Sequence, residues 1–291
     1  MPTQVLSRRG GPGDATAGPK AFSLAELLIV LAVVATLAVL QVPTLGNAKS
    51  GSRLAICQDN LRQLTRGWLL YAQDNNGRLT GNLDGGDVMA GMANAARTWC
   101  VGWLDFNGGS PSGANTNTQF LSEAQLGPYI QKEVRIFRCP ADPSVSLFGG
   151  VAYPRVRSVS MNCYMGERGQ PYTAGYKQFK TLDEITGPSP AKALVFIDER
   201  EDSINDGWFG INMIGFDPPG PDARIMVDFP ADWHGRRGSL SFADGHVESW
   251  HWRDPRTMPR HRKGILLPLA VATPNNTDVA RIQAAASSKA K

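Results

Sequence analysis

The pattern of apolar and polar positions separates an almost continuous apolar run near the N-terminus from a mixed remainder. The run extends from Phe22 to Val42 and reads FSLAELLIVLAVVATLAVLQV. Four polar residues interrupt it: Ser23, Glu26, Thr36 and Gln41. Because about 20 apolar residues are enough for a helix to cross a bilayer, we expect residues 22–43 to form a transmembrane or filament-core helix. Pro43 lacks a backbone donor and is expected to kink the helix at that point.

A second helical pattern follows the apolar run. Apolar residues recur at spacings of three and four, which marks one face of an amphipathic helix. They are Leu54, Cys57, Leu61, Leu64, Trp68 and Tyr71. The sequence Asn75-Asn76-Gly77 is expected to end this helix. We therefore predict an amphipathic stem helix over residues 44–76 that packs against the rest of the chain.

The remaining residues show shorter patterns. Residues 77–118 are rich in Gly, Asn and Ser and predict loops, with a short strand near 99–106, and further strands are expected at 134–138, 156–161 and 193–198. In GSLSFADGHVESWHW, residues 238–252, two alternating stretches flank Asp244 and Gly245, as a two-residue hairpin turn requires. That turn would pair Phe242 with Val247 and Leu240 with Ser249.

These elements predict an α+β fold. We expect a long kinked N-terminal helix, its first half transmembrane, packed on a small antiparallel sheet with long loops. The head would occupy residues 77–264, and residues 265–291 would form a C-terminal tail.

Charge adds an orientation to this arrangement. The 30 basic and 26 acidic residues give a net charge of +4, too even a balance for a nucleic-acid surface. Three basic residues, Arg8, Arg9 and Lys20, precede the apolar run. Positive charge marks the cytoplasmic end of a span. We therefore expect a single-pass inner-membrane protein with a cytoplasmic N-terminus and a periplasmic head.

Four widely spaced cysteines fit an oxidising compartment. They are Cys57, Cys100, Cys139 and Cys163, and no CxxC pair occurs among them. An even count allows two disulfides in any of three connectivities. We expect one of them to join Cys57 to Cys139.

The start of the apolar run carries a family resemblance. Residues 20–29, KAFSLAELLI, resemble the processing site of type IV prepilins and type II secretion pseudopilins. The resemblance implies a leader over residues 1–21, cleavage between Ala21 and Phe22 by a prepilin peptidase, methylation of the new Phe22 amine and a role for Glu26 in assembly. A secretory signal or a plain anchor has no use for an acid that costs about 3 kcal/mol or more inside an apolar helix. Glu26 lies one helical turn from Phe22, where it can pair with the amine of its own or a neighbouring subunit.

Four further segments resemble the same group of proteins. His234, nine intervening residues and Asp244-Gly245 are similar to the H-X9-DG signature near the end of many prepilin-type proteins. The other three are CQDNLRQL at 57–64, FRCPADPS at 137–144 and VFIDEREDSINDGWF at 195–209.

Two groups of residues suggest metal chemistry. His234, His246 and His251 could ligate zinc, but the odd spacing of the last two puts them on opposite faces of a strand. We therefore expect a structural His234 that bonds hairpin backbone or Asp244.

The densest acidic segment contains Asp198, Glu199, Asp202 and Asp206. Oxygen ligands suit calcium, although Ile204 and Met213 break the EF-hand pattern. A solvated acidic loop is the default and a structural calcium site is the alternative. We expect no required cofactor.

No catalytic motif accompanies these features, and we expect no enzyme. The resemblance implies a structural subunit of a type II secretion pseudopilus or type IV pilus-like filament. Its partners would be a prepilin peptidase, other pilin or pseudopilin subunits, the assembly machinery and the membrane, with no nucleic acid. The alternative is a membrane-anchored, exported sugar-binding or adhesive protein whose Trp-rich head does the binding.

Overall fold

The computed structural model describes residues 23–106, 113–167, 171–262 and 264–290, apart from the side chains of residues 37–50. The chain divides into two compact units, Met1–Ala48 and Lys49–Lys291. We describe each unit separately.

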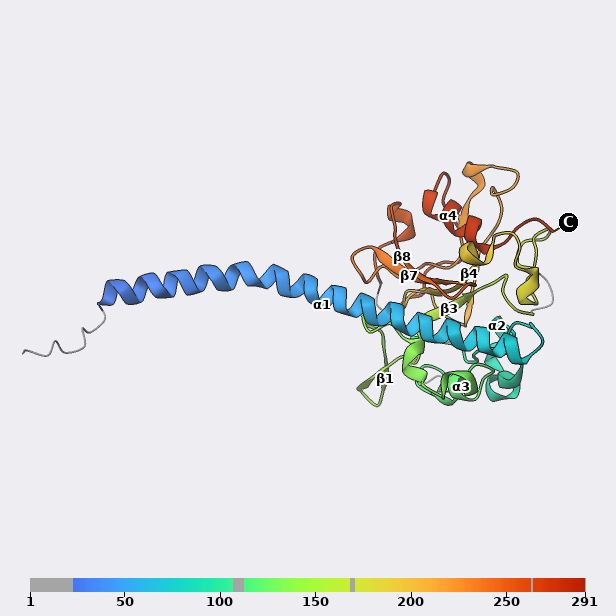
Figure 1. The fold of residues 1–291 in the computed structure, drawn as a ribbon, viewed down its shortest axis with the longest axis horizontal. Helices are drawn as coiled ribbons and strands as arrows, with labels where there is room; N and C mark the ends of the chain where they lie inside the picture. Colours follow the sequence, from blue (N-terminus) through green and yellow to red (C-terminus); the bar gives the residue numbers. More distant parts are fainter. Residues whose placement is uncertain (1–22, 107–112, 168–170, 263, 291) are drawn as a thin grey trace, which may run out of the picture. The chain divides into compact units, whose positions relative to one another are not determined.

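Helix α1 is the longest element and runs from Leu24 to Asp74 (Figure 1). It is continuous through Pro43, where the sequence predicted a division into two segments. In the second unit its predicted apolar face is confirmed, since four residues at helical spacing are fully buried: Cys57, Leu61, Leu64 and Trp68. The helix ends where Asn75-Asn76-Gly77 predicted, because Asn76 and Gly77 adopt left-handed backbone angles, φ 55° and 80°.

The expected transmembrane half of this helix is wrong. Within the part of the chain that the structure describes, no helix combines the length and the apolar character that a membrane span requires. The single-pass inner-membrane localisation rested on that span and is corrected with it.

The centre of the second unit is a five-stranded sheet with strand order β5-β3-β4-β7-β8. Its strands are β3 (Val159–Asn162), β4 (Leu194–Asp198), β5 (Trp208–Phe209), β7 (Arg237–Phe242) and β8 (Val247–His251). The pair β3–β5 is parallel and the other pairs are antiparallel. The sheet is therefore mixed, and the prediction of a purely antiparallel sheet is wrong.

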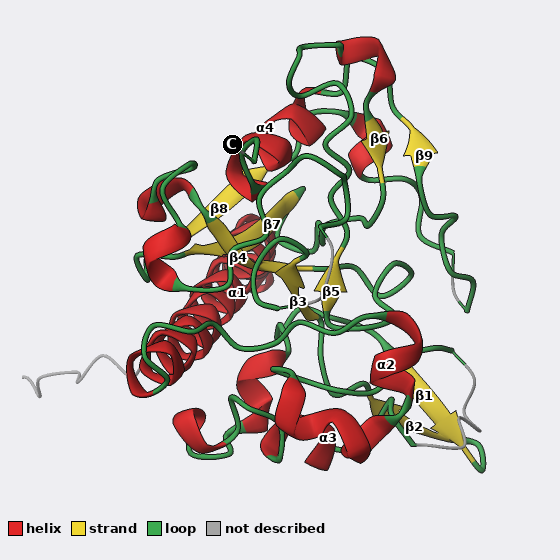
Figure 2. Cartoon of the chain, turned by 90° about the vertical axis from the view of Figure 1, so that its right-hand side faces the viewer, coloured by secondary structure: helices red, strands yellow, loops and turns green. Residues whose placement is uncertain are grey.

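Smaller elements surround this sheet. They are the hairpin of β1 (Val145–Phe148) and β2 (Val151–Pro154), the pair β6 (Ile225–Met226) and β9 (Val271–Ala272), and the helices α2 (Gly85–Met89), α3 (Gln119–Ser122) and α4 (Thr277–Ala286). Short 3-10 helices lie between several elements of the chain. Figure 2 shows α4 and the β6–β9 pair on one side of the sheet, and α2, α3 and the β1–β2 hairpin on the other.

Two predicted strands do not form. Residues Val134–Phe137 make a 3-10 helix, η3, and residues 99–106 lie in a loop. Both segments are nevertheless buried in part, since Trp99 stacks on Phe137 with ring centroids 5.7 Å apart. Their apolar residues fill the core without sheet hydrogen bonds, so an apolar pattern alone did not identify the backbone conformation.

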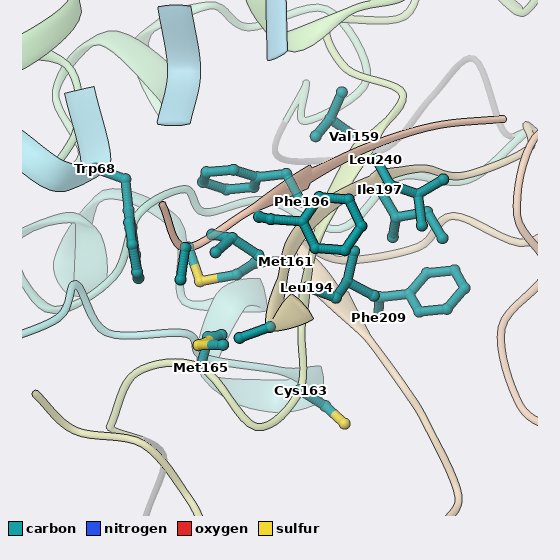
Figure 3. Packing of buried hydrophobic residues seen from close by; sticks show 14 of the residues in the cluster. Trp68, Val159, Met161, Cys163, Met165, Leu194, Phe196, Ile197, Phe209 and Leu240 are labelled. Carbon is teal, nitrogen blue, oxygen red and sulfur yellow. The ribbon is translucent and has the colours of Figure 1, made fainter. Parts of the chain in front are cut away.

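The main core forms where α1 meets the sheet (Figure 3). Trp68 from the helix lies in the same apolar cluster as Phe196 and Ile197 of β4 and Leu240 of β7. Burial of one such side chain contributes about 1.5–3 kcal/mol. The second half of α1 is therefore an integral part of the folded head.

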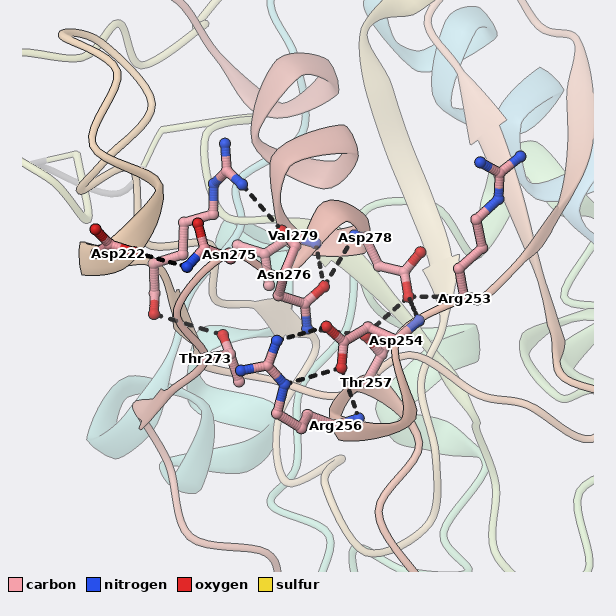
Figure 4. A network of polar contacts seen from close by, with 11 residues as sticks. Asp222, Arg253, Asp254, Arg256, Thr257, Thr273, Asn275, Asn276, Asp278 and Val279 are labelled. Atoms are coloured by element: carbon pink, nitrogen blue, oxygen red, sulfur yellow. Dashed lines mark hydrogen bonds and ion pairs between the residues drawn. The ribbon is translucent and has the colours of Figure 1, made fainter.

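The C-terminal segment is tied to the end of β8 by polar contacts (Figure 4). Asn276 caps α4 by accepting hydrogen bonds from the amides of Asp278 and Val279. Asp278 Oδ2 in turn accepts from the amides of Arg253 and Asp254. Residues 265–290 thus contribute a packed helix to the head.

Candidate functional site

The hairpin of the H-X9-DG segment has a different register from the one predicted. Ser241 pairs with Val247 and Leu240 with Glu248. The Phe242 amide donates to the His246 carbonyl at 3.0 Å, so the loop contains the three residues 243–245 and not two. Gly245 has φ 95°, the left-handed position of a three-residue hairpin loop. The extra loop residue shifts the pairing by one, which moves Val247 and Ser249 out of the predicted pairs.

Asp244 of this segment stabilises the loop locally. Its Oδ1 accepts a hydrogen bond from the amide of His246 at 3.1 Å and lies 2.5 Å from the same residue's Nδ1. His251, on β8, is exposed. The three histidines of the segment therefore do not converge on one point.

His234 lies in a buried cluster of four side chains. Its Nε2 is 3.1 Å from Cys139 Sγ, and Cys57 Sγ donates a hydrogen bond of 2.8 Å to Asp198 Oδ2. One nitrogen, sulfur or oxygen atom from each residue lies within 4.8 Å of the other three. All four residues are buried, with exposed fractions of 0–6%. The expected partners of His234, hairpin backbone or Asp244, are replaced by Cys139.

Each member of the cluster is held by a different part of the head. Cys57 is on the buried face of α1 and Asp198 is the last residue of β4. Cys139 follows η3, and its amide donates to Ser158 Oγ at 2.8 Å. His234 lies in the turn that precedes β7. The cluster therefore forms only when helix, sheet and loops are all in place.

Burial favours the neutral forms of Cys57, Asp198 and His234. Burial raises the pKa of Asp198 to about 7, although hydrogen bonds from Cys57 and Ser239 oppose the shift. A hydrogen bond with Cys139, burial and the Asp198 carboxylate raise the pKa of the Cys57 thiol well above its usual value. Burial and the charge of Arg53 lower the pKa of His234. A cation among these groups would reverse the preference of the Cys57 thiol and the Asp198 carboxyl.

The acidic segment does not form one site. Asp198 joins the cysteine cluster, whereas Asp202 forms a buried ion pair with Arg200, whose Nη2 donates to Oδ2 at 2.9 Å. Glu199 accepts from Ser203 Oγ at 2.6 Å. Asp206 accepts from the amides of Gly85 and Trp208. The four acids are buried, so the predicted solvated loop is wrong, and each has its own partner.

None of the four cysteines is joined in a disulfide among the described residues. Cys57 and Cys139, which we expected to pair, share the cluster. Cys163 Sγ accepts from the amide of Ile211 at 3.3 Å, and Cys100 is buried beside Gly207. The expected disulfide stays a prediction.

The expected processing site lies at the edge of the described residues. Ala21 and Phe22 are outside them, and the structure begins at Ser23. Glu26 Oε2 accepts from the amide and the hydroxyl of Ser23, both at 2.8 Å, and Ser23 Oγ accepts from the Glu26 amide at 3.3 Å. These reciprocal bonds form a capping box at the start of α1.

The apolar side chains that follow this box are exposed. The exposed fractions of eight of them range from 50% to 74%: Leu24, Leu27, Leu28, Ile29, Val30, Leu31, Val33 and Val34. They surround the helix on all sides, because five consecutive residues cover more than one full turn. Helices that are apolar on all sides are ordinarily buried.

Comparison with known proteins identifies no relative: no protein-family model matches the chain, and neither the curated proteins nor the solved structures give a significant match.

The sequence pattern missed the cysteine cluster, although a signal was present. Each of the four segments that resemble the prepilin-type group carries one member: Cys57 in 57–64, Cys139 in 137–144, Asp198 in 195–209 and His234 at the start of the H-X9-DG segment. Four residues of metal-ligating types, one in each distinctive segment, would have indicated a shared site.

Proposed function

We propose that this protein is a structural subunit of a pilin-like filament, of the type IV pilus or type II secretion pseudopilus kind, and that it assembles through the first part of α1. The observation that carries the proposal is the exposed apolar surface of Leu24–Val34. A helix that is apolar on every side needs several neighbours around it. Equivalent helices of other subunits supply such an environment in a filament.

The start of the helix supports the same function. The capping box between Ser23 and Glu26 begins α1 directly after the peptide bond that the resemblance marks for cleavage. Cleavage before Phe22 would create a new amine four residues before Glu26. Hydrogen bonds from the Ser23 amide and hydroxyl hold the pKa of Glu26 below its usual value, so the carboxylate is charged at neutral pH. An amine and a carboxylate that enter an apolar filament core as a pair avoid the cost of an isolated charge.

Processing tests the proposal directly. The full chain is produced with an active prepilin peptidase, and the N-terminus is determined by mass spectrometry. The expected product begins at N-methylated Phe22 and sediments with other pilin subunits. Ala21→Leu is the matched variant, because a bulky side chain before the cut should block processing. A chain that keeps residues 1–21 beside an active peptidase would contradict the proposal.

The burial of most tryptophans disfavours the sugar-binding alternative. Five tryptophans have exposed fractions of 7% or less: Trp68, Trp99, Trp208, Trp250 and Trp252. Their rings fill the core and do not form a stacking platform. Glycan-array binding by the full chain would revive the alternative.

A further inference from the structure

We infer that Cys57, Cys139, Asp198 and His234 bind one zinc ion, which fastens the second half of α1 to the sheet and loops of the head. The inference stands apart from filament assembly, because all four residues lie in the unit Lys49–Lys291.

The spacing of the four side chains fits tetrahedral coordination. With zinc–sulfur bonds of about 2.3 Å and zinc–nitrogen or –oxygen bonds of about 2.0 Å, a sulfur lies about 3.5 Å from a neighbouring nitrogen or oxygen. The observed contacts are 2.8 Å for Cys57 Sγ–Asp198 Oδ2 and 3.1 Å for Cys139 Sγ–His234 Nε2. The first must lengthen by about 0.7 Å and the second by about 0.4 Å to reach this spacing, and small side-chain rotations can provide such shifts.

A buried atom of Asp198 supports a ligand at this point. Asp198 is completely buried, and its Oδ1 has no hydrogen-bond partner among the described residues. Its Oδ2 receives bonds from the Cys57 thiol and, at 3.4 Å, from the Ser239 amide. A buried carboxyl with one unsatisfied oxygen is costly. A dication coordinated by this carboxylate and two thiolates offsets most of that cost.

The ligand types select zinc. Two thiols and an imidazole favour a borderline-soft ion with tetrahedral geometry, whereas calcium and magnesium prefer six or more oxygen atoms or octahedral geometry. Four protein ligands complete the coordination sphere, and their burial leaves no open position for a substrate. The arrangement is that of a structural zinc site and not of a catalytic one.

Two other states of the cluster must be distinguished from a zinc site. One is a disulfide between Cys57 and Cys139, which would remove both thiolates. The other is a set of neutral side chains joined only by hydrogen bonds. The experiment separates these states by metal content, by spectroscopy and by the covalent state of the sulfurs.

Metal content is the first measurement. The full chain is purified under reducing conditions with a tag that contains no histidine, and bound metals are counted by plasma mass spectrometry. We expect about one zinc ion per chain. Cys139→Ser and His234→Asn should lower bound zinc at least about tenfold. Cys100→Ser and Cys163→Ser are matched controls, because they change buried cysteines outside the cluster, and both should keep the zinc.

Cobalt substitution tests the wild-type chain in case the cluster variants do not fold. Co²⁺ replaces zinc in tetrahedral sites, and thiolate ligands add a charge-transfer band that oxygen ligands do not give. We expect this band, and the intense visible absorption of tetrahedral cobalt, at one equivalent.

Four results would overturn the inference. The first is a wild-type protein that holds no stoichiometric metal and shows no cobalt bands, and the second is a different metal bound at the same stoichiometry. The third is an equal zinc content in the cluster variants and the wild type. The fourth is a disulfide between Cys57 and Cys139 in unreduced protein from its native compartment.

Discussion

The thiol of Cys57 in α1 donates a 2.8 Å hydrogen bond to Asp198 at the end of β4, across a sequence separation of 141 residues. The contact joins the longest helix to the central sheet at a point where both residues are fully buried. It lies beside the apolar cluster that contains Leu61 and Leu64. Helix α1 is thus part of the head's core from Cys57 onward, and substitutions on its buried face should report on the stability of the whole head.

The first prediction concerns this buried face. Leu64→Ala removes a fully buried side chain and should lower the free energy of unfolding by about 2–5 kcal/mol. Leu70→Ala is the matched control, because Leu70 is 39% exposed on the same helix, and it should cost about 0.5 kcal/mol or less. Urea denaturation of the full chain measures both. Equal losses would mean that the helix does not pack in the head as described.

The second prediction separates steric overlap from backbone strain. Gly166 and Gly175 have similar left-handed φ values of 83° and 79°. A Cβ at Gly166 would lie 2.1 Å from the carbonyl oxygen of Thr80, whereas at Gly175 no atom lies within 4 Å. Gly175→Ala should therefore cost about 1–2 kcal/mol, the conformational penalty alone. Gly166→Ala should cost at least about 2 kcal/mol more, because backbone must move.

Thermal unfolding of the two glycine variants provides the comparison. Similar melting temperatures would show that the approach of Thr80 to Gly166 is not rigid.

The third prediction concerns pH. Burial raises the pKa of Asp228 to about 8, with the charge of Asp206 adding to the shift, and the adjacent Glu199 is also shifted upward. Because the folded-state pKa exceeds the ordinary 3.8, the stability that this group contributes is fully present below about pH 4 and is lost as the pH rises to about 8. Asp228→Asn cannot ionise, and its side-chain oxygen can still accept from the Gly210 amide.

Between pH 5 and pH 8 the free energy of unfolding of Asp228→Asn should therefore fall less than that of the wild type. Urea denaturation at several pH values from about 4 to about 8 measures this difference. Exposed Asp222→Asn is the control and should follow the wild-type slope. Parallel curves for Asp228→Asn and wild type would mean that Asp228 is ionised in the folded protein.

The fourth prediction concerns calcium. Asp202 is neutralised by Arg200, and Asp206 accepts two backbone amides, so neither is arranged with the others around a common point. The melting temperature should therefore be unchanged between chelator and millimolar calcium, once zinc content is held constant. A rise that follows mass action would instead support the calcium alternative.

Residue periodicity predicted the elements in which packing against the rest of the head produces a regular pattern of apolar positions. The spacing from Cys57 to Trp68 identified the buried face of α1, and the apolar run ALVFI identified β4, which is buried along its full length. The hairpin was predicted but its register was not, because Gly245 suits both a two-residue turn and the last position of a three-residue loop. The 3-10 helix at Val134–Phe137 was read as a strand, since four apolar-rich residues show no period of their own.

The candidate site was harder to predict for a physical reason. Cys57, Cys139, Asp198 and His234 occur on four elements, and no local spacing relates them. Only the packing of α1 on the sheet brings them together. Histidine and acidic residues were instead grouped by closeness in sequence, which placed His234 with Asp244, while the structure pairs it with Cys139.

The last prediction separates the two roles of Glu26. Its carboxylate accepts from Ser23 in the capping box, and the proposed filament also requires its charge to pair with the Phe22 amine. Glu26→Gln keeps a side-chain acceptor, so helix content by circular dichroism should be unchanged. Filament incorporation should fail, because an uncompensated amine in an apolar bundle costs roughly 3–5 kcal/mol. Ser23→Ala does the reverse: it weakens the cap by about 1 kcal/mol but keeps the charge, and the variant should assemble. Co-sedimentation with partner subunits measures the incorporation of both variants. Normal incorporation of Glu26→Gln would mean that assembly depends on the apolar surface of Leu24–Val34 and not on the charge of Glu26.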